Sequence, residues 1–210
     1  GIPTVLVDVS KENAEKGKDY SRRLVEKDVS RGKSTQEKGD KLLDLITTTD
    51  NYDDVKGADL VIEAVFENEE LKAKITKQAE AVLGEDAVFG SNTSTLPITG
   101  LAKASDRPEN FIGIHFFSPV ERMGLVEIIS GEKTTEATLA KAIDYVLAIR
   151  KTPIAVNDSR GFYTSRCFGT YTREGMEMLA EGIKPAIIEN VGRQSGMPMG
   201  PLEVSDSVGL

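Results

Sequence analysis

The single histidine of the chain, His115, lies in the stretch GIHFFSPVERMGLVEII, residues 113–129, which also contains Glu127. A neutral imidazole readily removes a proton near neutral pH, and a carboxylate at its second nitrogen fixes the tautomer and stabilises the imidazolium. Each residue lies in an apolar run, so two adjacent strands would bring the pair together. From the residues alone, a histidine packed structurally beside Phe116 and Phe117 is the more frequent outcome.

Composition describes an ordinary globular chain, because 39% of the 210 residues are hydrophobic and 29% are charged. No apolar run approaches the ~20 residues that cross a bilayer, and residues 1–10 do not resemble a signal peptide. We therefore expect a cytoplasmic protein without a membrane span. The lone Cys167 excludes an internal disulfide, and no Cys/His cluster has metal-ligand spacing, so no metal is expected. The net charge of −8 argues against general nucleic-acid binding.

Short apolar runs alternate with charged or amphipathic stretches, which indicates strands separated by helices. The expected strands include TVLVDVS, ADLVIEAV, NFIGIHFF, LVEIIS and TPIAVND. Their apolar character is typical of strands buried on both faces, so the sequence predicts an α/β fold with a Rossmann-like, doubly wound, mostly parallel sheet. Strand signals stop after Asp158. We place the sheet domain at residues 1–156 and the start of an all-helical domain at residues 157–210.

A ligand of such a sheet binds at the carboxyl ends of the strands, where Asp8, Glu67, Ser94 and His115 are expected. The Asp8 carboxylate can accept hydrogen bonds from both ribose hydroxyls of a dinucleotide and would repel a 2′-phosphate, which favours NAD over NADP. A turn or helix-capping aspartate is equally expected from the strand alone. The glycine-rich turn that precedes such an acid by about 20 residues would fall before Gly1.

Six motifs occur in order: LVDVS, DLVIEAVFENEELK, SNTSTLPI, GIHFFSPVERMGLVEII, NDSRGFYTSR and GMPMGPLEVSDSVGL. In order and spacing they resemble the L-3-hydroxyacyl-CoA dehydrogenase family, over nearly the whole chain. GFYTSR looks most like the dehydrogenase part of multifunctional fatty-acid oxidation complex alpha subunits. The resemblance implies reversible NAD-dependent oxidation of an L-3-hydroxyacyl-CoA to a 3-ketoacyl-CoA. It also implies a fragment truncated at both ends, without the family's first strand and GxGxxG turn, and therefore impaired in NAD binding.

The resemblance assigns the base and its orienting acid to His115 and Glu127. It implies that Ser94 hydrogen-bonds the reacting oxygen and lies against the nicotinamide, which makes it a catalytic, cofactor-binding and substrate-binding residue. Further positions that would line the dinucleotide site are Ala64, Glu67 and Lys72. From the residues alone, a Ser/Asn/Thr cluster usually makes a turn, a glutamate after a strand caps a helix, and Lys72 lies on a solvated helix face.

Two serines stand where many relatives have asparagine. Ser118 replaces the asparagine of HFFNP at the cofactor site and still donates and accepts a hydrogen bond, with a shorter reach. Ser165 replaces the asparagine of GFxxNR, which implies a catalytic and substrate-binding position. Residues 11–33 hold eight Lys or Arg against five Asp or Glu, and Lys27 and Arg31 could contact coenzyme A phosphates. A solvated helix face accounts for these charges equally well.

The expected partners are an acyl-CoA substrate and either a second copy of the chain or a β-oxidation multienzyme complex. Two alternatives stay open at this stage. One is a non-catalytic α/β module, as lens crystallins of this superfamily suggest. The other is a relative that oxidises 3-hydroxybutyryl-CoA or a sugar acid, because acyl-chain length cannot be read from these residues.

Overall fold

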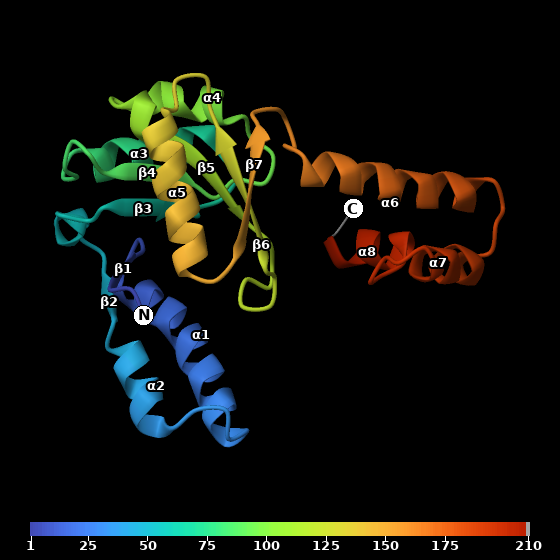
Figure 1. Ribbon diagram of the computed structural model, residues 1–210, viewed down its shortest axis with the longest axis horizontal. Helices are drawn as coiled ribbons and strands as arrows, with labels where there is room; N and C mark the ends of the chain where they lie inside the picture. The colour runs from blue at the N-terminus through green and yellow to red at the C-terminus, as the bar shows by residue number, and fades with distance from the viewer. Residues whose placement is uncertain (209–210) are drawn as a thin grey trace.

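The strands of the computed structural model, which describes residues 1–208, lie in two sheets (Figure 1). The smaller sheet pairs two parallel strands, β1 (Thr4–Val7) and β2 (Ile46–Thr49). The larger sheet contains, in spatial order, β3 (Leu60–Glu63), β4 (Val88–Ser91), β5 (Phe111–Phe116), β6 (Leu125–Ser130) and β7 (Thr152–Asn157). Its neighbouring strands run parallel except β5 and β6, which are antiparallel. The predicted α/β fold with a mostly parallel sheet is therefore confirmed.

Helices join the strands and continue the chain beyond β7. Several of them begin at a Ser, Thr or Asn whose side chain accepts a hydrogen bond from a backbone amide of the first turn, as Ser10 and Asn68 do. The α-helices are α1 (Lys11–Ser30), α2 (Gln36–Leu43), α3 (Glu69–Glu80), α4 (Ile98–Leu101), α5 (Glu136–Ala148), α6 (Thr164–Ala180), α7 (Pro185–Gln194) and α8 (Pro201–Val208). Helix α2 is not predicted from the sequence, because it is short, mostly polar and interrupted by Gly39.

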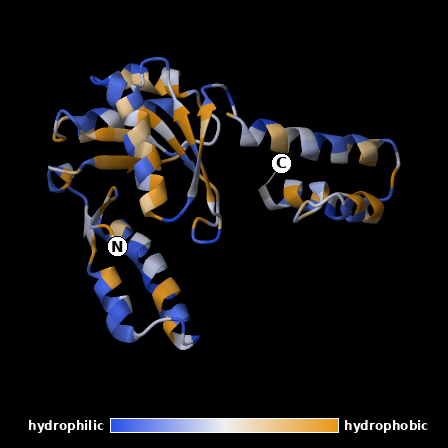
Figure 2. Ribbon diagram, viewed as in Figure 1, coloured by the Kyte–Doolittle hydropathy of each residue, from blue (hydrophilic) through white to orange (hydrophobic). Residues whose placement is uncertain are grey.

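Both faces of the larger sheet are covered by helices, as a doubly wound fold requires. Alternate residues of each strand point to opposite faces, so the core has two layers. The layer that includes α3 and α4 contains Ala79, Phe89, Ile98, Phe111, Ile129 and Phe162. The layer under α5 contains Val88, Ile112, Ile114, Val126, Ile128, Ala142 and Val146. Hydrophobic residues gather on the strands of this sheet, while α1 and α2 carry long hydrophilic stretches (Figure 2).

The last three helices, α6, α7 and α8, pack on one another and extend to one side of the sheet (Figure 1). Gly175 of α6 permits this packing, because a Cβ at that position would lie 2.6 Å from the Pro201 ring of α8. The last two residues of the predicted helical domain, 209–210, lie outside the described residues. Within residues 1–208, no helix is long and apolar enough to cross a membrane.

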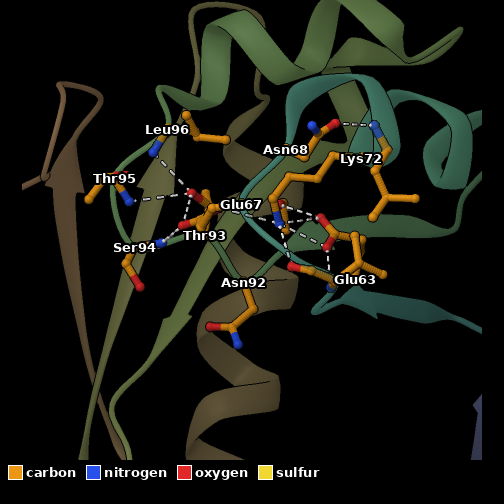
Figure 3. Close-up of polar contacts among 12 residues, drawn as sticks. Glu63, Glu67, Asn68, Lys72, Asn92, Thr93, Ser94, Thr95 and Leu96 are labelled. Atoms are coloured by element: carbon orange, nitrogen blue, oxygen red, sulfur yellow. Dashed lines mark hydrogen bonds and ion pairs between the residues drawn. The ribbon is translucent and has the colours of Figure 1, made fainter. Parts of the chain in front are cut away.

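A buried ion pair ties α3 to the sheet (Figure 3). The ammonium of Lys72 lies 2.9 and 3.1 Å from the two carboxylate oxygens of Glu63, and the two residues are only 1% and 4% exposed. The hydroxyl of Ser91 and the backbone amide of Val65 also donate to the Glu63 carboxylate, at 2.7 and 2.6 Å. The expectation that Lys72 lies on a solvated helix face is therefore wrong, because Glu63 of β3 draws the ammonium into the interior.

Replacement of Lys72 by Met should lower the free energy of unfolding by about 3–5 kcal/mol, because it leaves a buried carboxylate without its counter-ion. Urea denaturation of the parent and the Lys72→Met variant measures the difference. The matched control is Lys74→Met, an exposed lysine on the same helix, which should change the free energy of unfolding by less than about 0.5 kcal/mol. Equal losses in the two variants would contradict the importance of the ion pair.

Gly113 of β5 allows α4 to pack against the sheet two residues before His115. A Cβ on Gly113 would lie 2.7 Å from Ile98 Cδ1 and 2.9 Å from Ile129 Cβ, both of them buried. Gly113→Ala should therefore lower the free energy of unfolding by about 1–3 kcal/mol through overpacking. Gly100→Ala, where an added Cβ meets nothing within 4 Å, is the control for a glycine-to-alanine change. Thermal or urea unfolding that ranks the two variants alike would refute this account.

Candidate active site

The antiparallel pairing of β5 and β6 places His115 directly opposite Glu127. Residues opposite each other on antiparallel strands point to the same face of the sheet. The imidazole Nδ1 accordingly lies 2.7 Å from Glu127 Oε2, and the residues are 5% and 0% exposed. An ionised carboxylate can only accept a hydrogen bond, so the neutral imidazole carries its proton on Nδ1 and has its lone pair on Nε2.

The Glu127 carboxylate also receives three hydrogen bonds from the start of α6. Oε1 accepts the backbone amides of Tyr163 and Thr164 at 3.1 and 2.8 Å, and Oε2 accepts the Thr164 hydroxyl at 2.7 Å. Helix α6 has no side-chain cap of its own at Tyr163, so Glu127 takes that role from the sheet. Burial raises the pKa of the Glu127 carboxyl, but hydrogen bonds from His115 and from Thr164 outweigh burial and bring this pKa below its ordinary value.

Two aromatic rings lie beside the imidazole. The His115 ring centroid lies 4.6 Å from that of Phe117 and 6.0 Å from that of Phe162, which follows β7. Phe162 is 1% exposed and belongs to the core layer under α3 and α4. The histidine is therefore packed among aromatic residues and hydrogen-bonded at one nitrogen, an environment that holds the ring in one orientation.

The SNTS segment, residues 91–94, begins at the last residue of β4 and is joined to the end of β5 and to the segment that follows β3. The side-chain oxygen of Asn92 accepts the backbone amide of Phe116 at 2.9 Å, which ties the segment to the end of β5. The Glu67 carboxylate accepts the Thr93 hydroxyl at 2.9 Å and the Ser94 amide at 2.6 Å. Figure 3 shows Glu67 between this segment and Lys72, whose ammonium lies 3.5 Å away. The residue Ser94 itself is exposed at this edge.

The other predicted cofactor residues lie at the carboxyl ends of the strands. Asp8 follows β1 and is exposed, and its carboxylate accepts only the adjacent Val9 amide, at 2.6 Å, among the contacts of the described residues. Ala64 follows β3 and Ser118 follows β5 by two residues, and both are exposed. The chemical groups of these residues suit a dinucleotide. The Asp8 carboxylate can accept from ribose hydroxyls, Ala64 is small, and the hydroxyl group of Ser118 is accessible. Lys72 differs, since its ammonium is buried against Glu63.

Among the contacts of the described residues, none of the predicted substrate residues hydrogen-bonds the His115 side chain. Ser165 follows Thr164 in the first turn of α6, but the hydroxyl of Ser165 makes no hydrogen bond to His115 or Glu127. Lys27 is exposed near the end of α1, and Arg31 lies just beyond the helix, at its distal end from the sheet (Figure 1). The middle of α1 does reach the loop after β5, because the Tyr20 hydroxyl donates to Glu121 at 3.0 Å.

Two residues of this region, Thr164 and Glu63, are absent from the sequence-based predictions. An acid inside the apolar run LVIEAV is a usable signal for Glu63, because a buried carboxylate requires a partner. Thr164 gives no such signal, since a threonine at the start of a helix is common and its partner lies 37 residues away.

Comparisons with known proteins place nearly the whole chain in one family. Residues 1–159 match the family model for the NAD binding domain of 3-hydroxyacyl-CoA dehydrogenase, and residues 161–210 match the model for its C-terminal domain. The chain is 42% identical over 209 residues to the fatty acid oxidation complex subunit alpha of Shewanella amazonensis and 44% identical over 211 residues to that of Idiomarina loihiensis. All of the chain is covered in both comparisons, but only 30% and 29% of these relatives.

Solved structures resemble the chain closely. The (S)-3-hydroxybutyryl-CoA dehydrogenase of Ralstonia eutropha superposes with a TM-score of 0.93 at 36% identity, covering 97% of this chain and 73% of that one. The 3-hydroxybutyryl-CoA dehydrogenase of Escherichia coli K12 gives a TM-score of 0.94 at 31% identity, covering 99% of this chain and 44% of the other. The chain therefore belongs to the 3-hydroxyacyl-CoA dehydrogenase family of NAD-dependent oxidoreductases.

Proposed function

We propose that this chain carries the proton-transfer site of an enzyme that oxidises L-3-hydroxyacyl-CoA to 3-ketoacyl-CoA in fatty-acid β-oxidation. The observation that carries the proposal is the buried pair of His115 and Glu127 at the edge of the sheet where the SNTS segment ends. The chain spans about 30% of the length of the curated relatives it matches, so we propose that it acts within a longer polypeptide that supplies the expected phosphate-binding turn.

In this proposal His115 Nε2 removes the proton of the substrate hydroxyl, because Nδ1 is already hydrogen-bonded to Glu127. The ionised carboxylate stabilises the imidazolium that results. Bound NAD supplies the hydride acceptor for the same carbon. Ser94 donates a hydrogen bond to the reacting oxygen, and Asp8, Ala64, Glu67 and Ser118 line the cofactor site. Lys72 supports that site from the protein interior through its ion pairs with Glu63 and Glu67.

The substrate and partner assignments extend the same proposal. Ser165, Lys27 and Arg31 are proposed to contact the acyl-CoA, the last two through its phosphates. The sheet domain at residues 1–156 would bind the cofactor, and the helical part from residue 157 would complete the acyl site and pack on a second copy or on another subunit of a cytoplasmic multienzyme complex. Exposed apolar side chains support this packing: Met176, Leu179, Ile187 and Val191.

A second candidate substrate is 3-hydroxybutyryl-CoA, because two of the matching structures are named as 3-hydroxybutyryl-CoA dehydrogenases. Rates for 3-ketoacyl-CoA substrates of increasing acyl length separate the two candidates. A rate that falls steadily beyond four carbons would favour the short-chain enzyme, whereas sustained rates for long chains would favour the fatty-acid oxidation activity.

His115→Ala in the intact parent protein should lower kcat/KM for reduction of acetoacetyl-CoA by NADH by about 10²- to 10⁴-fold, because it removes the general acid–base group. Absorbance of NADH measures the rate. Lys133→Ala, an exposed residue in the loop after β6, is the control and should retain the parent rate. Equal rates for the parent and the His115→Ala variant would rule out this assignment and favour the non-catalytic alternative.

A further inference from the structure

We propose that Thr164 is a positioning residue whose hydroxyl, together with the first amides of α6, holds the Glu127 carboxylate in place against His115. The inference deepens the proposed function, because it concerns how the base and its orienting acid are held. It does not depend on which acyl-CoA is the substrate.

The hydroxyl of Thr164 and the imidazole share a single acceptor atom. Both Thr164 Oγ1 and His115 Nδ1 lie 2.7 Å from Glu127 Oε2, while Oε1 accepts the two α6 amides. Glu127 is fully buried, so its charge must be satisfied by protein donors. The Thr164 side chain supplies the one donor on Oε2 besides the imidazole among the contacts of the described residues.

The groups that face Glu127 come from three elements, which are β5, β7 and the start of α6. His115 of β5 is the titratable group among them, and β7 places the apolar Ile154 opposite Glu127. Helix α6 contributes the amides of Tyr163 and Thr164 and the Thr164 hydroxyl. A change at the Thr164 hydroxyl therefore acts on the charge that the imidazole meets, because His115 is the one ionisable side chain hydrogen-bonded to Glu127 among the described residues.

Loss of the Thr164 hydroxyl should leave more unbalanced negative charge on the Glu127 oxygen that contacts the imidazole. An oxygen that has lost one of its two donors carries more unbalanced negative charge, which favours the charged form of the histidine. The histidine should then take up its proton at higher pH. The same change withdraws a donor from a buried carboxylate, so Glu127 should lose part of its fixed orientation.

The test uses the fact that His115 is the only histidine of the 210-residue chain. With histidine labelled by ¹³C and ¹⁵N, the NMR titration of the chain reports one imidazole. Thr164→Val should shift the titration midpoint upward by roughly half a pH unit. Thr164→Ser keeps the hydroxyl and should return the midpoint to the parent value. Thr170→Val, an exposed threonine on the same helix whose hydroxyl donates to Arg166 O, controls for the loss of a threonine hydroxyl and should not shift it.

Two further variants test whether the shift comes from loss of the hydroxyl and whether it acts through the Glu127 charge. Thr164→Ala removes the same hydroxyl without a new methyl group, and serves if Thr164→Val fails to fold. In a Glu127→Gln background, the Thr164 substitution should produce no additional shift, because the charge through which it acts is gone. Folded Val and Ala variants that titrate like the parent would overturn the proposal, as would an equal shift in Thr170→Val.

The titration needs neither cofactor nor substrate, so it separates this inference from the proposed function. In the intact parent protein, the acidic limb of the pH profile of kcat/KM for hydroxyacyl-CoA oxidation should move to higher pH by the same amount in Thr164→Val. A role in folding alone would lower the stability or the rate without moving that limb. A shifted titration in an inactive parent would support the positioning role and contradict the enzymatic proposal.

Discussion

The geometry of the site depends on the hydrogen bonds that surround the buried Glu127 carboxylate. A buried charge costs several kcal/mol unless donors surround it, and Glu127 meets that requirement with hydrogen bonds from a histidine, a hydroxyl and two amides. Those donors come from β5 and from the start of α6. One side chain therefore contacts the neighbouring strand, holds the first turn of a helix and fixes the tautomer of the only imidazole in the chain.

The same edge of the sheet is stabilised by a second buried carboxylate. Glu63 at the end of β3 accepts from Lys72, Ser91 and the Val65 amide. Both acids point into the core layer shared with α3 and α4, where apolar packing leaves few donors. Each accepts a hydrogen bond from the helix that comes next after a strand of the sheet, α3 after β3 for Glu63 and α6 after β7 for Glu127. Packing of those two helices is therefore coupled to the geometry of the polar groups at the strand ends.

The sequence predicted the strands and most helices because their signals are local. Apolar runs and helical periodicity extend over a few residues, and the spacing of the β5–β6 hairpin brings His115 and Glu127 together through a separation of only 12 residues. Features that depend on distant partners were missed. Lys72 is part of a charged helical pattern, and its burial follows from a glutamate on a neighbouring strand. Thr164 gains its significance only when α6 folds back onto β6.

Attachment of α6 to Glu127 has a consequence for how the helical part and the sheet work together. Three hydrogen bonds join the start of α6 to Glu127, and two of them come from backbone amides and not from side chains. Any movement that separates α6 from β6 must withdraw these donors and leave a buried carboxylate facing the imidazole with little else to balance it. Such a state is costly, so the helical part and the His115–Glu127 pair should hold one arrangement together. In this fold the position of the helical part and the orientation of the His115 ring therefore depend on the same few atoms.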